Sequence, residues 1–362
     1  MKDSFFEWLD RVHLKIYKTV TKIAYLALVR KRSNQGQTLT TEEKKRVKNY
    51  WRQYGFTHVP MQEYKWYKKQ GLEVTGRIIP DVIWHSIIEP HFNSYIMEKG
   101  FEDKNYFETI IGKENSPSTL IHCVNGQLLD KNYMGIDLET TIQAISAYKS
   151  VICKPSVDTG GGRGIIFINA GEIDCKKFKE IESLYNGNFI VQKIVHQHPF
   201  FAAFNPSALN TMRIMTLLFE GKVHFLSGFL RVGAEGSRVD NVSNGGRYIQ
   251  IMKDGTLGNR AISEDLRNHD LVFTDRNVEQ REIIPNWDRI WETIERAQYK
   301  LPHFRLINWD VALSEDGVPI IIEYNLMDSS SYFHQVNCGP IFGELTEKVL
   351  SEVFSDKKRQ AK

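Results

Sequence analysis

Three oxygen-bearing side chains near the end of the chain are spaced so that they could hold a cation. Asp310 lies in one apolar run, while Glu323 and Asn325 lie in the next, with a short polar segment between. Pairing the runs as antiparallel strands, with Ser314 and Pro319 at the turn, places Asp310 opposite Glu323. Asn325 then shares a face with Glu323, because strand side chains alternate between faces. One hairpin would therefore present all three oxygen ligands together.

Two opposed carboxylates need positive charge between them. At roughly 4 Å and an effective dielectric near 20, they repel by about 4 kcal/mol. Carboxylate and amide oxygens are hard ligands that suit Mg²⁺, which is usually bound by one or two carboxylates together with substrate phosphates. The alternative is a hairpin whose acids simply face water. The spacing thus favours a magnesium and phosphate site without excluding that alternative.

A second candidate lies near the middle of the chain, where a glycine-rich loop separates two apolar strands. The first strand ends at Lys154, and the second covers residues 165–168. The loop between them contains Gly160, Gly161, Gly162 and Gly164. Glycines let backbone N–H groups approach an anion closely. The loop is neither a Walker A motif, which needs Gly-Lys-Ser/Thr opening a helix, nor a Rossmann fingerprint, because a strand follows it. The loop is therefore either a loop that covers phosphates or a flexible hairpin tip.

Two arginines occupy strands that are otherwise apolar. Arg213 begins one strand of a predicted hairpin and Arg231 ends the other, with a Glu-Gly-Lys turn between them. Buried arginines require partners, and their fork of donors suits phosphate or carboxylate. The polar loop 237–246 that follows is either a substrate-contacting loop or a long surface connection.

The elements that must position these groups belong to a chain large enough for two or three subdomains. It has 362 residues, of which 41% are hydrophobic, and a net charge of +3. Because this charge is small for the length, we expect no nucleic-acid partner. The four cysteines form no CxxC or Cys/His pair, which argues against a zinc site and a disulfide framework and fits a reducing compartment.

The N-terminal segment is predicted to be an amphipathic helix. Apolar residues recur at helical spacing from Phe5 to Ala27, beside Lys15, Lys18 and Lys22. Its longest apolar run, residues 23–29, is too short to span a bilayer, and its acids do not suit a secretory signal. We therefore expect a cytoplasmic protein. The helix either packs on the domain that follows or rests on an anionic inner-membrane surface.

The order of these motifs resembles the ATP-grasp superfamily: a lysine before a helix, a strand-end lysine, a glycine-rich loop, a hinge strand, an arginine strand and a terminal Asp…Glu-x-Asn. The finer run is similar to its sugar-transfer-associated branch, which tends to accompany genes for surface polysaccharide synthesis. That run comprises Val191-Gln192, His198-Pro199, Asn210-Thr211-x-Arg213, Arg231-Val232-Gly233, Asp240-Asn241, Gly245-Gly246 and Trp309-Asp310-Val311-Ala312. The resemblance covers roughly residues 60 to 350.

The resemblance implies an α+β chain with an ATP-grasp fold, in which two α+β subdomains clamp ATP after an N-terminal helical segment. The expected limits are a helical, basic amphipathic segment at 1–58, an α/β region at 59–145, a small subdomain with the glycine-rich loop at 146–200, a large subdomain with the metal site at 201–352 and a basic tail at 353–362.

The resemblance also implies roles for individual residues. Lys104 and Lys154 would reach the ATP phosphates, and the glycines at 160, 161, 162 and 164 would close over them. The adenine would be held by Gln192, Lys193, Ile194 and Val195, although many members carry Glu where this chain has Gln192. Metal binding would fall to Asp310, Glu323 and Asn325, with one or two Mg²⁺ ions or Mn²⁺ in their place. The candidate catalytic residues are Arg213, Arg231 and Asn241.

The activity implied is carboxylate activation. A substrate carboxylate attacks the γ-phosphate, an acylphosphate forms, and an amine displaces phosphate. The expected enzyme is an ADP-forming ligase that joins an amino acid or another amine to a carboxylate, such as a uronic-acid sugar of a capsule or O-antigen precursor, free or linked to a nucleotide or lipid. Two alternatives remain: a kinase on the same fold, and a binding protein of the polysaccharide machinery that has lost turnover.

Overall fold

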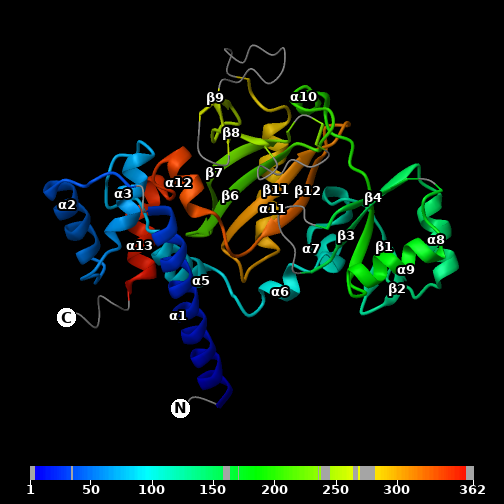
Figure 1. The fold of residues 1–362 in the computed structure, drawn as a ribbon, viewed down its shortest axis with the longest axis horizontal. Helices are drawn as coiled ribbons and strands as arrows, with labels where there is room; N and C mark the ends of the chain where they lie inside the picture. The colour runs from blue at the N-terminus through cyan, green and yellow to red at the C-terminus, as the bar shows by residue number, and fades with distance from the viewer. Residues whose placement is uncertain are drawn as a thin grey trace. The chain divides into compact units, whose positions relative to one another are not determined.

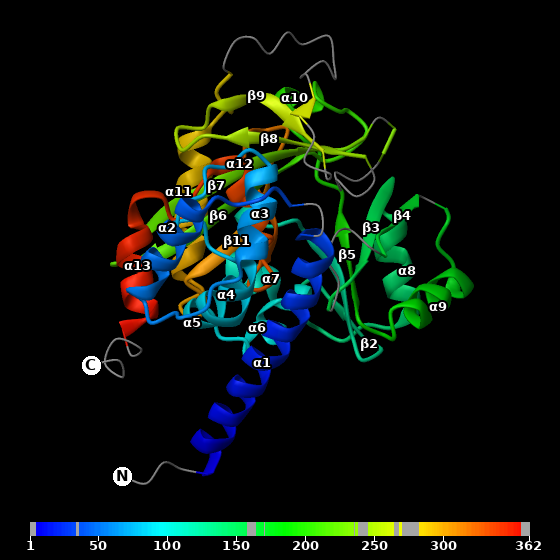
Figure 2. The ribbon, with the colours of Figure 1, turned by 60° about the vertical axis from the view of Figure 1, so that its left-hand side comes forward.

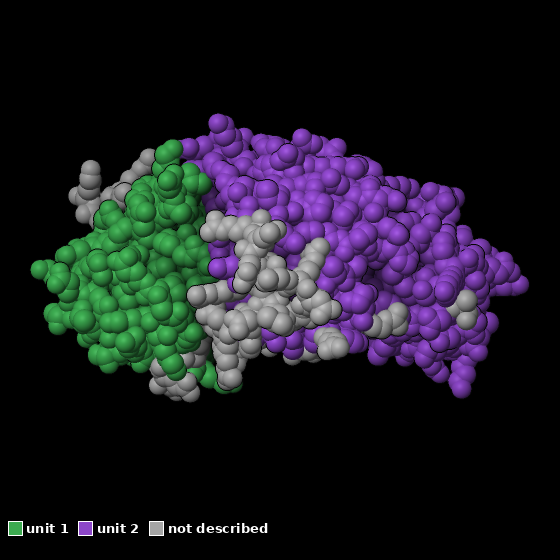
Figure 3. Space-filling view, turned by 90° about the horizontal axis from the view of Figure 1, so that it is seen from above, with its two compact units in different colours: residues 1–94, 327–362 green, residues 95–326 purple. Residues whose placement is uncertain are grey.

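The computed structural model describes residues 5–33, 36–157, 164–169, 171–234, 236–237, 245–263, 268–269 and 282–355. The chain divides into two compact units, which Figure 3 shows in different colours. Unit 1 comprises residues 1–94 and 327–362, and unit 2 comprises residues 95–326. Helices and antiparallel sheets occur together, so the predicted α+β class is confirmed.

Unit 1 is helical in its described residues. Its elements are α1 (Phe5–Ser33), α2 (Thr41–Arg52), α3 (Met61–Lys69), α4 (Asp81–Ile83), the π-helical turn η1 (Trp84–Ile88), α5 (Glu89–Phe92), α12 (Ser331–Cys338), η5 (Gly343–Leu345) and α13 (Thr346–Val353). The predicted N-terminal helix is confirmed as α1. A capping box opens α2, since the Thr40 hydroxyl accepts from the Glu43 N–H and the Glu43 carboxylate accepts from the Thr40 N–H.

Aromatic side chains form the centre of unit 1. Trp51 of α2 is fully buried and packs edge to face against Phe56 and Phe354, with ring centroids 5.3 and 6.3 Å apart. Phe354 follows α13, so residues from the two ends of the chain share this core. The dense aromatic residues of the N-terminal region therefore serve packing, as aromatic pairs in cores usually do.

Unit 2 contains two sheets. The smaller has the strand order β2-β1-β5-β3-β4. Its strands are β1 (Thr119–Val124), β2 (Gln127–Asp130), β3 (Ser150–Pro155), β4 (Ile166–Asn169) and β5 (Phe189–Lys193). The helices α8 (Leu138–Ser146) and α9 (Cys175–Leu184) pack on it through Ile145, Phe178 and Ile181. Figure 1 shows this sheet and its two helices in green.

Strand β5 ends at Lys193, partway through the segment 192–195 that the resemblance assigns to adenine. Gln192 is the last residue of β5 paired with β1, and Lys193 is the last paired with β3. β1 begins at Thr119, opposite Gln192, and the one further residue of β3, Ser150, pairs with β4 only. Ile194 and Val195 lie in the connection that follows β5.

The larger sheet is antiparallel, with the strand order β10-β9-β8-β7-β6-β11-β12. Its strands are β6 (Thr211–Phe219), β7 (Lys222–Val232), β8 (Arg247–Ile251), β9 (Leu257–Ile262), β10 (Asn268–His269), β11 (Leu306–Leu313) and β12 (Pro319–Asn325). The helix α11 (Trp287–Tyr299) covers one face through Ile290 and Ile294. The short elements of unit 2 are α6 (Glu98–Phe101), η2 (Lys104–Tyr106), α7 (Phe107–Ile111), η3 (Lys113–Asn115) and α10 (Pro199–Ala202).

The hairpin of β11 and β12 has the predicted register. Asp310 pairs with Glu323, and Asn308 pairs with Asn325, with a bulge between Asp310 and Val311. A bulge adds one residue to one strand and increases the local twist. The predicted helical turns starting at Lys104 are also confirmed, as η2 followed by α7.

Candidate active site

The candidate site lies on the face of the larger sheet that is turned away from α11. Alternation separates the two faces, because Met212 and Ile214 of β6 and Trp309 and Val311 of β11 join the core with α11. The residues between them must point the other way. Arg213 therefore shares the opposite face with the acidic residue that pairs with it on β11.

Asp310 is held by two arginines. The guanidinium of Arg213 donates to both of its oxygens, at 2.9 and 2.8 Å, and Arg231 of β7 approaches within 3.1 Å. Arg231 also donates to the Thr211 hydroxyl at 2.9 and 2.7 Å. Burial alone would raise the pKa of Asp310, but the two guanidinium groups outweigh burial and hold this pKa below its usual value. Asp310 is therefore a buried, ionised carboxylate.

Glu323 is paired with Lys104. Their charged atoms are 2.9 Å apart, and both side chains are largely buried. Lys104 opens η2, where Asp103 caps the first turn, and its backbone N–H donates to the carbonyl of Ser156 at 2.9 Å. That bond ties η2 to the segment that leaves β3. The lysine predicted before the helix thus meets the predicted metal-binding acid.

Lys154 is the most buried cation of the site. It lies near the end of β3 and is 8% exposed. Burial, reinforced by the like charge of Lys104, lowers the pKa of Lys154 to about 8, while Glu323 opposes that shift. Lys154 is therefore within electrostatic reach of the Lys104–Glu323 pair.

Together these contacts join four cations to two carboxylates. The cations are Lys104, Lys154, Arg213 and Arg231, and the carboxylates are Asp310 and Glu323. The combined charge is positive in a largely buried place, where electrostatic interactions are strong. Such a place can bind a polyanion, because lysines and arginines are the side chains that pair with phosphate. The positive charge that the two opposed acids require is supplied here by side chains of the protein.

An amide oxygen beside these acids is suited to hold a cation. Among the described residues, Asn308 Oδ1 is buried without a hydrogen-bond partner. Asn325 opposes it across the hairpin, and the buried atom of Asn325 without a partner is Nδ2, which donates hydrogen bonds and does not ligate a cation. An unsatisfied buried carbonyl oxygen is costly, and a bound cation would satisfy it. With Glu323 it completes a set of hard oxygen ligands of the kind Mg²⁺ takes. The residues present therefore fit the ion.

Asn308 is the residue that sequence reasoning missed. It precedes Asp310 by two positions on the same strand, so the alternation that grouped the other candidates also places it on their face. A search for amides as well as acids at that spacing would have found it.

Of the four residues expected to hold adenine, two have side chains that already contact other parts of the protein. Gln192 is buried and donates to the Thr119 hydroxyl at 3.0 Å, so its amide is bound to strand β1. The ammonium group of Lys193 lies 4.9 Å from the centre of the Tyr148 ring. Ile194 and Val195 follow the strand and are half-buried, and their backbone groups belong to no named strand.

Four predicted site residues lie outside the described residues: Gly160, Gly161, Gly162 and Asn241. Gly164, at the end of the predicted loop, has a φ of +75°, and its carbonyl accepts from the Tyr185 hydroxyl. A positive φ of this size favours glycine. Gly164 thus fixes the end of the loop against α9.

Comparisons with known proteins identify the family. The chain matches the family described as sugar-transfer associated ATP-grasp over residues 86–349. No curated protein matches it. Similar solved structures include L-amino acid ligase from Bacillus licheniformis, with 15% identity over 65% of this chain and 43% of that one and a TM-score of 0.36. D-alanyl-alanine synthetase A from Vibrio cholerae has 12% identity over 71% of this chain and 66% of that one, with a TM-score of 0.41.

A third similar structure is the ATP-grasp ligase PsnB complexed with minimal precursor, Mg and ADP. It has 14% identity over 72% of this chain and 62% of that one, with a TM-score of 0.41. The match spans less than two thirds of each of these three proteins. Among the helices of the described residues, none has both the length and the apolar character needed to cross a bilayer.

Proposed function

This chain belongs to the sugar-transfer-associated ATP-grasp family, and on that premise we propose that it is an ATP- and Mg²⁺-dependent carboxylate–amine ligase. The reaction would pass through an acylphosphate and release ADP and phosphate. The carboxylate we propose is a uronic-acid sugar of a surface polysaccharide precursor, free or linked to a nucleotide or lipid, and the amine is an amino acid or another small amine.

The observation that supports this proposal most strongly is the positive site on the larger sheet. Lys154 and Arg213 come from different sheets of unit 2, yet both serve the group around Asp310 and Glu323. A polyphosphate between the sheets would meet cations from both sides. A site of this composition suits phosphoryl transfer, in which catalysis is mostly positioning and charge stabilisation.

Each side chain has a definite task in this proposal. Lys104 and Lys154 bind phosphate oxygens, and Arg213 and Arg231 stabilise the charge that develops as the γ-phosphoryl group is transferred. Mg²⁺, when bound, would neutralise phosphate oxygens, with Asp310, Glu323 and Asn325 as the proposed protein ligands and Asn308 Oδ1 as a further one. The reaction demands little acid–base chemistry from the protein, because the attacking carboxylate is already ionised.

Phosphorus NMR of the purified protein tests the reaction class. The sample contains Mg-ATP, a pool of amino acids and free or nucleotide-linked uronic acids. We expect ADP and free phosphate only when an acid and an amine are both present, and mass spectrometry of the same tube identifies the product. A new phosphomonoester without free phosphate would show that the protein is a kinase and would overturn the ligase proposal.

Replacing Glu323 tests the metal site within that reaction. Glu323→Gln keeps the shape and one acceptor oxygen but removes the charge, so we expect turnover to fall by about 10²-fold or more. The matched control is Glu315→Gln, which removes an exposed acid from the turn of the same hairpin. Equal turnover in the two variants, with equal thermal melting, would remove Glu323 from the site.

A further inference from the structure

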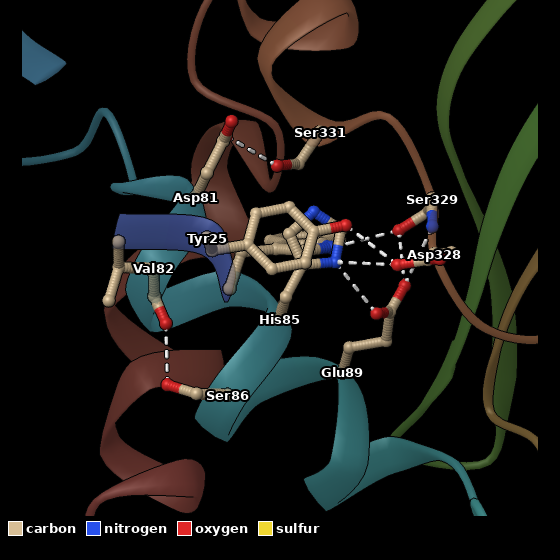
Figure 4. Close-up of polar contacts among 10 residues, drawn as sticks. Tyr25, Asp81, Val82, His85, Ser86, Glu89, Asp328, Ser329 and Ser331 are labelled. Carbon is tan, nitrogen blue, oxygen red and sulfur yellow. Dashed lines mark hydrogen bonds and ion pairs between the residues drawn. The ribbon is translucent and has the colours of Figure 1, made fainter. Parts of the chain in front are cut away.

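The long helix α1 packs along one side on the rest of unit 1. The Tyr25 ring stacks on the His85 ring, with centroids 3.8 Å apart and planes 16° apart, and its hydroxyl donates to Asp328 at 2.6 Å. Val29, one turn later, is 2% exposed. Figure 4 shows Tyr25 lying over His85, with Asp328 and Glu89 beside them. The orientation of α1 about its own axis is therefore set by these contacts.

The polar side chains beneath Tyr25 are joined to one another by hydrogen bonds. His85 lies 2.9 Å from a Glu89 oxygen, and the other Glu89 oxygen accepts from the N–H and hydroxyl of Ser329 at 2.9 and 2.6 Å. His85, Glu89 and Asp328 are close enough together to ligate an ion. Since both Glu89 oxygens and Asp328 Oδ1 already have partners, the group fits best as the attachment point of α1.

A different side of α1 carries an exposed apolar stripe. Its members are Trp8, Ile16, Val20 and Ile23, which are 52%, 55%, 59% and 63% exposed. At 3.6 residues per turn they fall within an arc of about 120°, whose centre is roughly 160° from Tyr25. In Figure 2 the N-terminal half of α1 extends beyond the other helices of its unit. Contiguous exposed apolar surface of this kind marks an interaction site.

The charge of α1 distinguishes between possible partners. Residues 5–33 contain seven lysines and arginines and two acids, whereas the whole chain has a net charge of +3. The rest of the chain is therefore net negative. Exposed Lys15 and Lys22 border one edge of the stripe, and exposed Lys31 borders the other. A second copy would bring two such cationic helices together, while an anionic surface would complement them.

We propose that α1 binds the surface of an anionic lipid bilayer, with the stripe of Trp8, Ile16, Val20 and Ile23 inserted among the headgroups and the flanking lysines on lipid phosphates. The helix lies in the plane of the surface, as amphipathic helices with basic flanks do. It is already folded and attached through Tyr25, so binding need not order the segment first.

Flotation of the full chain with vesicles tests this proposal. We expect the protein to float with vesicles of phosphatidylcholine and phosphatidylglycerol, to float much less with phosphatidylcholine alone, and to lose binding as salt is raised. Replacing Lys15 and Lys22 together by Gln should weaken binding by about 30-fold, at the usual contribution of a basic residue near such a surface. Equal flotation with neutral vesicles would contradict the charge argument.

A matched pair of double variants isolates the stripe. Ile16→Glu with Ile23→Glu should weaken binding by at least about 100-fold, because two apolar side chains can no longer insert. Thr21→Glu with Leu28→Glu adds the same charge at a half-exposed and an exposed position of α1, each about 80° or more from the edge of the stripe, and should retain most of the binding. Equal loss in both pairs would overturn the assignment of the stripe. Light scattering that showed a dimer lost only in the stripe variant, without vesicle binding, would instead assign it to a second copy.

Discussion

At the scale of single residues, the lowered pKa of Lys154 has consequences that can be measured directly. Burial and Lys104 hold its pKa at about 8, whereas an unfolded chain would keep the ordinary lysine value. Below pH 8 the lysine is charged in both states. Between pH 8 and about 10.5 the folded protein releases a proton that the unfolded chain keeps, so the contribution of Lys154 to stability increases with pH across that window.

Nucleotide binding should depend on pH through the same lysine. Phosphates near Lys154 favour its charged form, so we expect proton uptake on ATP binding at pH 8 to 9 and weaker affinity as pH rises through this range. Calorimetry in buffers of different ionisation enthalpy measures the uptake. Lys154→Arg is the control, because a guanidinium stays protonated there. Identical proton uptake in the variant would exclude Lys154 as its source.

The sequence predicted part of this chemistry for a physical reason. The opposition of Asp310 and Glu323 follows from turn composition and strand alternation, which are local properties. Their ion pairs with Arg213 and Lys104 join residues that are distant in the chain, and no local pattern encodes them. The requirement for positive charge was predictable from the hairpin alone. The four cations were named only through the resemblance, and their pairing with these two acids came from the fold. The roles of the site residues stay predictions.

At the scale of elements, the turn between β11 and β12 sets which acids meet. Gly317 in that turn has a φ of +70°, and its carbonyl accepts from the Asn286 amide at 3.0 Å. A Cβ added at Gly317 would lie 2.5 Å from Asn286 Nδ2. The turn is therefore restricted both by its backbone conformation and by its neighbour.

Replacing Gly317 by Ala should destabilise the protein by about 2 kcal/mol. About half comes from the left-handed backbone conformation and the rest from the lost Asn286 bond. Gly221→Ala is the matched control, since Gly221 has a φ of +75° with nothing within 4 Å of an added Cβ. We expect urea denaturation to give about 1 kcal/mol for the control. Equal losses would show that Asn286 contributes nothing to the turn.

The strands themselves were predictable where apolar periodicity is strong, and their ends were less so. The hairpin of β11 and β12 was predicted within a few residues, because both strands are bounded by turn residues. The end of β5 has a different origin: Ile194 and Val195 are apolar like the strand before them, but neither pairs with β1 or β3. Where a ladder ends depends on its partners, which a local pattern does not contain.

At the scale of the whole molecule, the ATP-grasp fold expected from the order of motifs is confirmed by the family match over residues 86–349. Residues 327–362 join residues 1–94 in one unit, a pairing of chain ends on which periodicity carries no information. The domain limits expected from the sequence stay a prediction. The order of motifs was informative because it depends on chain topology rather than on any one contact.

Thermal melting of the full chain should report the coupling of nucleotide and metal. At about a hundredfold excess over the dissociation constant, a ligand adds about 2.7 kcal/mol to stability. We expect ATP and Mg²⁺ together to raise the melting temperature by more than the sum of the increases that each gives alone. AMP with Mg²⁺ is the control, because it lacks the phosphates that reach both lysines. Simple additivity would contradict the coupling.

The pairing of Asp310 with two arginines, and of Glu323 with Lys104, has a consequence for how ligands enter. In the resting site each of the two carboxylates already has a cationic partner, and the four cations leave an excess of positive charge. A polyphosphate that binds here competes with the carboxylates for these cations, and a carboxylate that loses its cation needs a new positive partner. A divalent ion meets that need, so we expect nucleotide and metal to bind together, with the ion neutralising part of the charge of the polyphosphate.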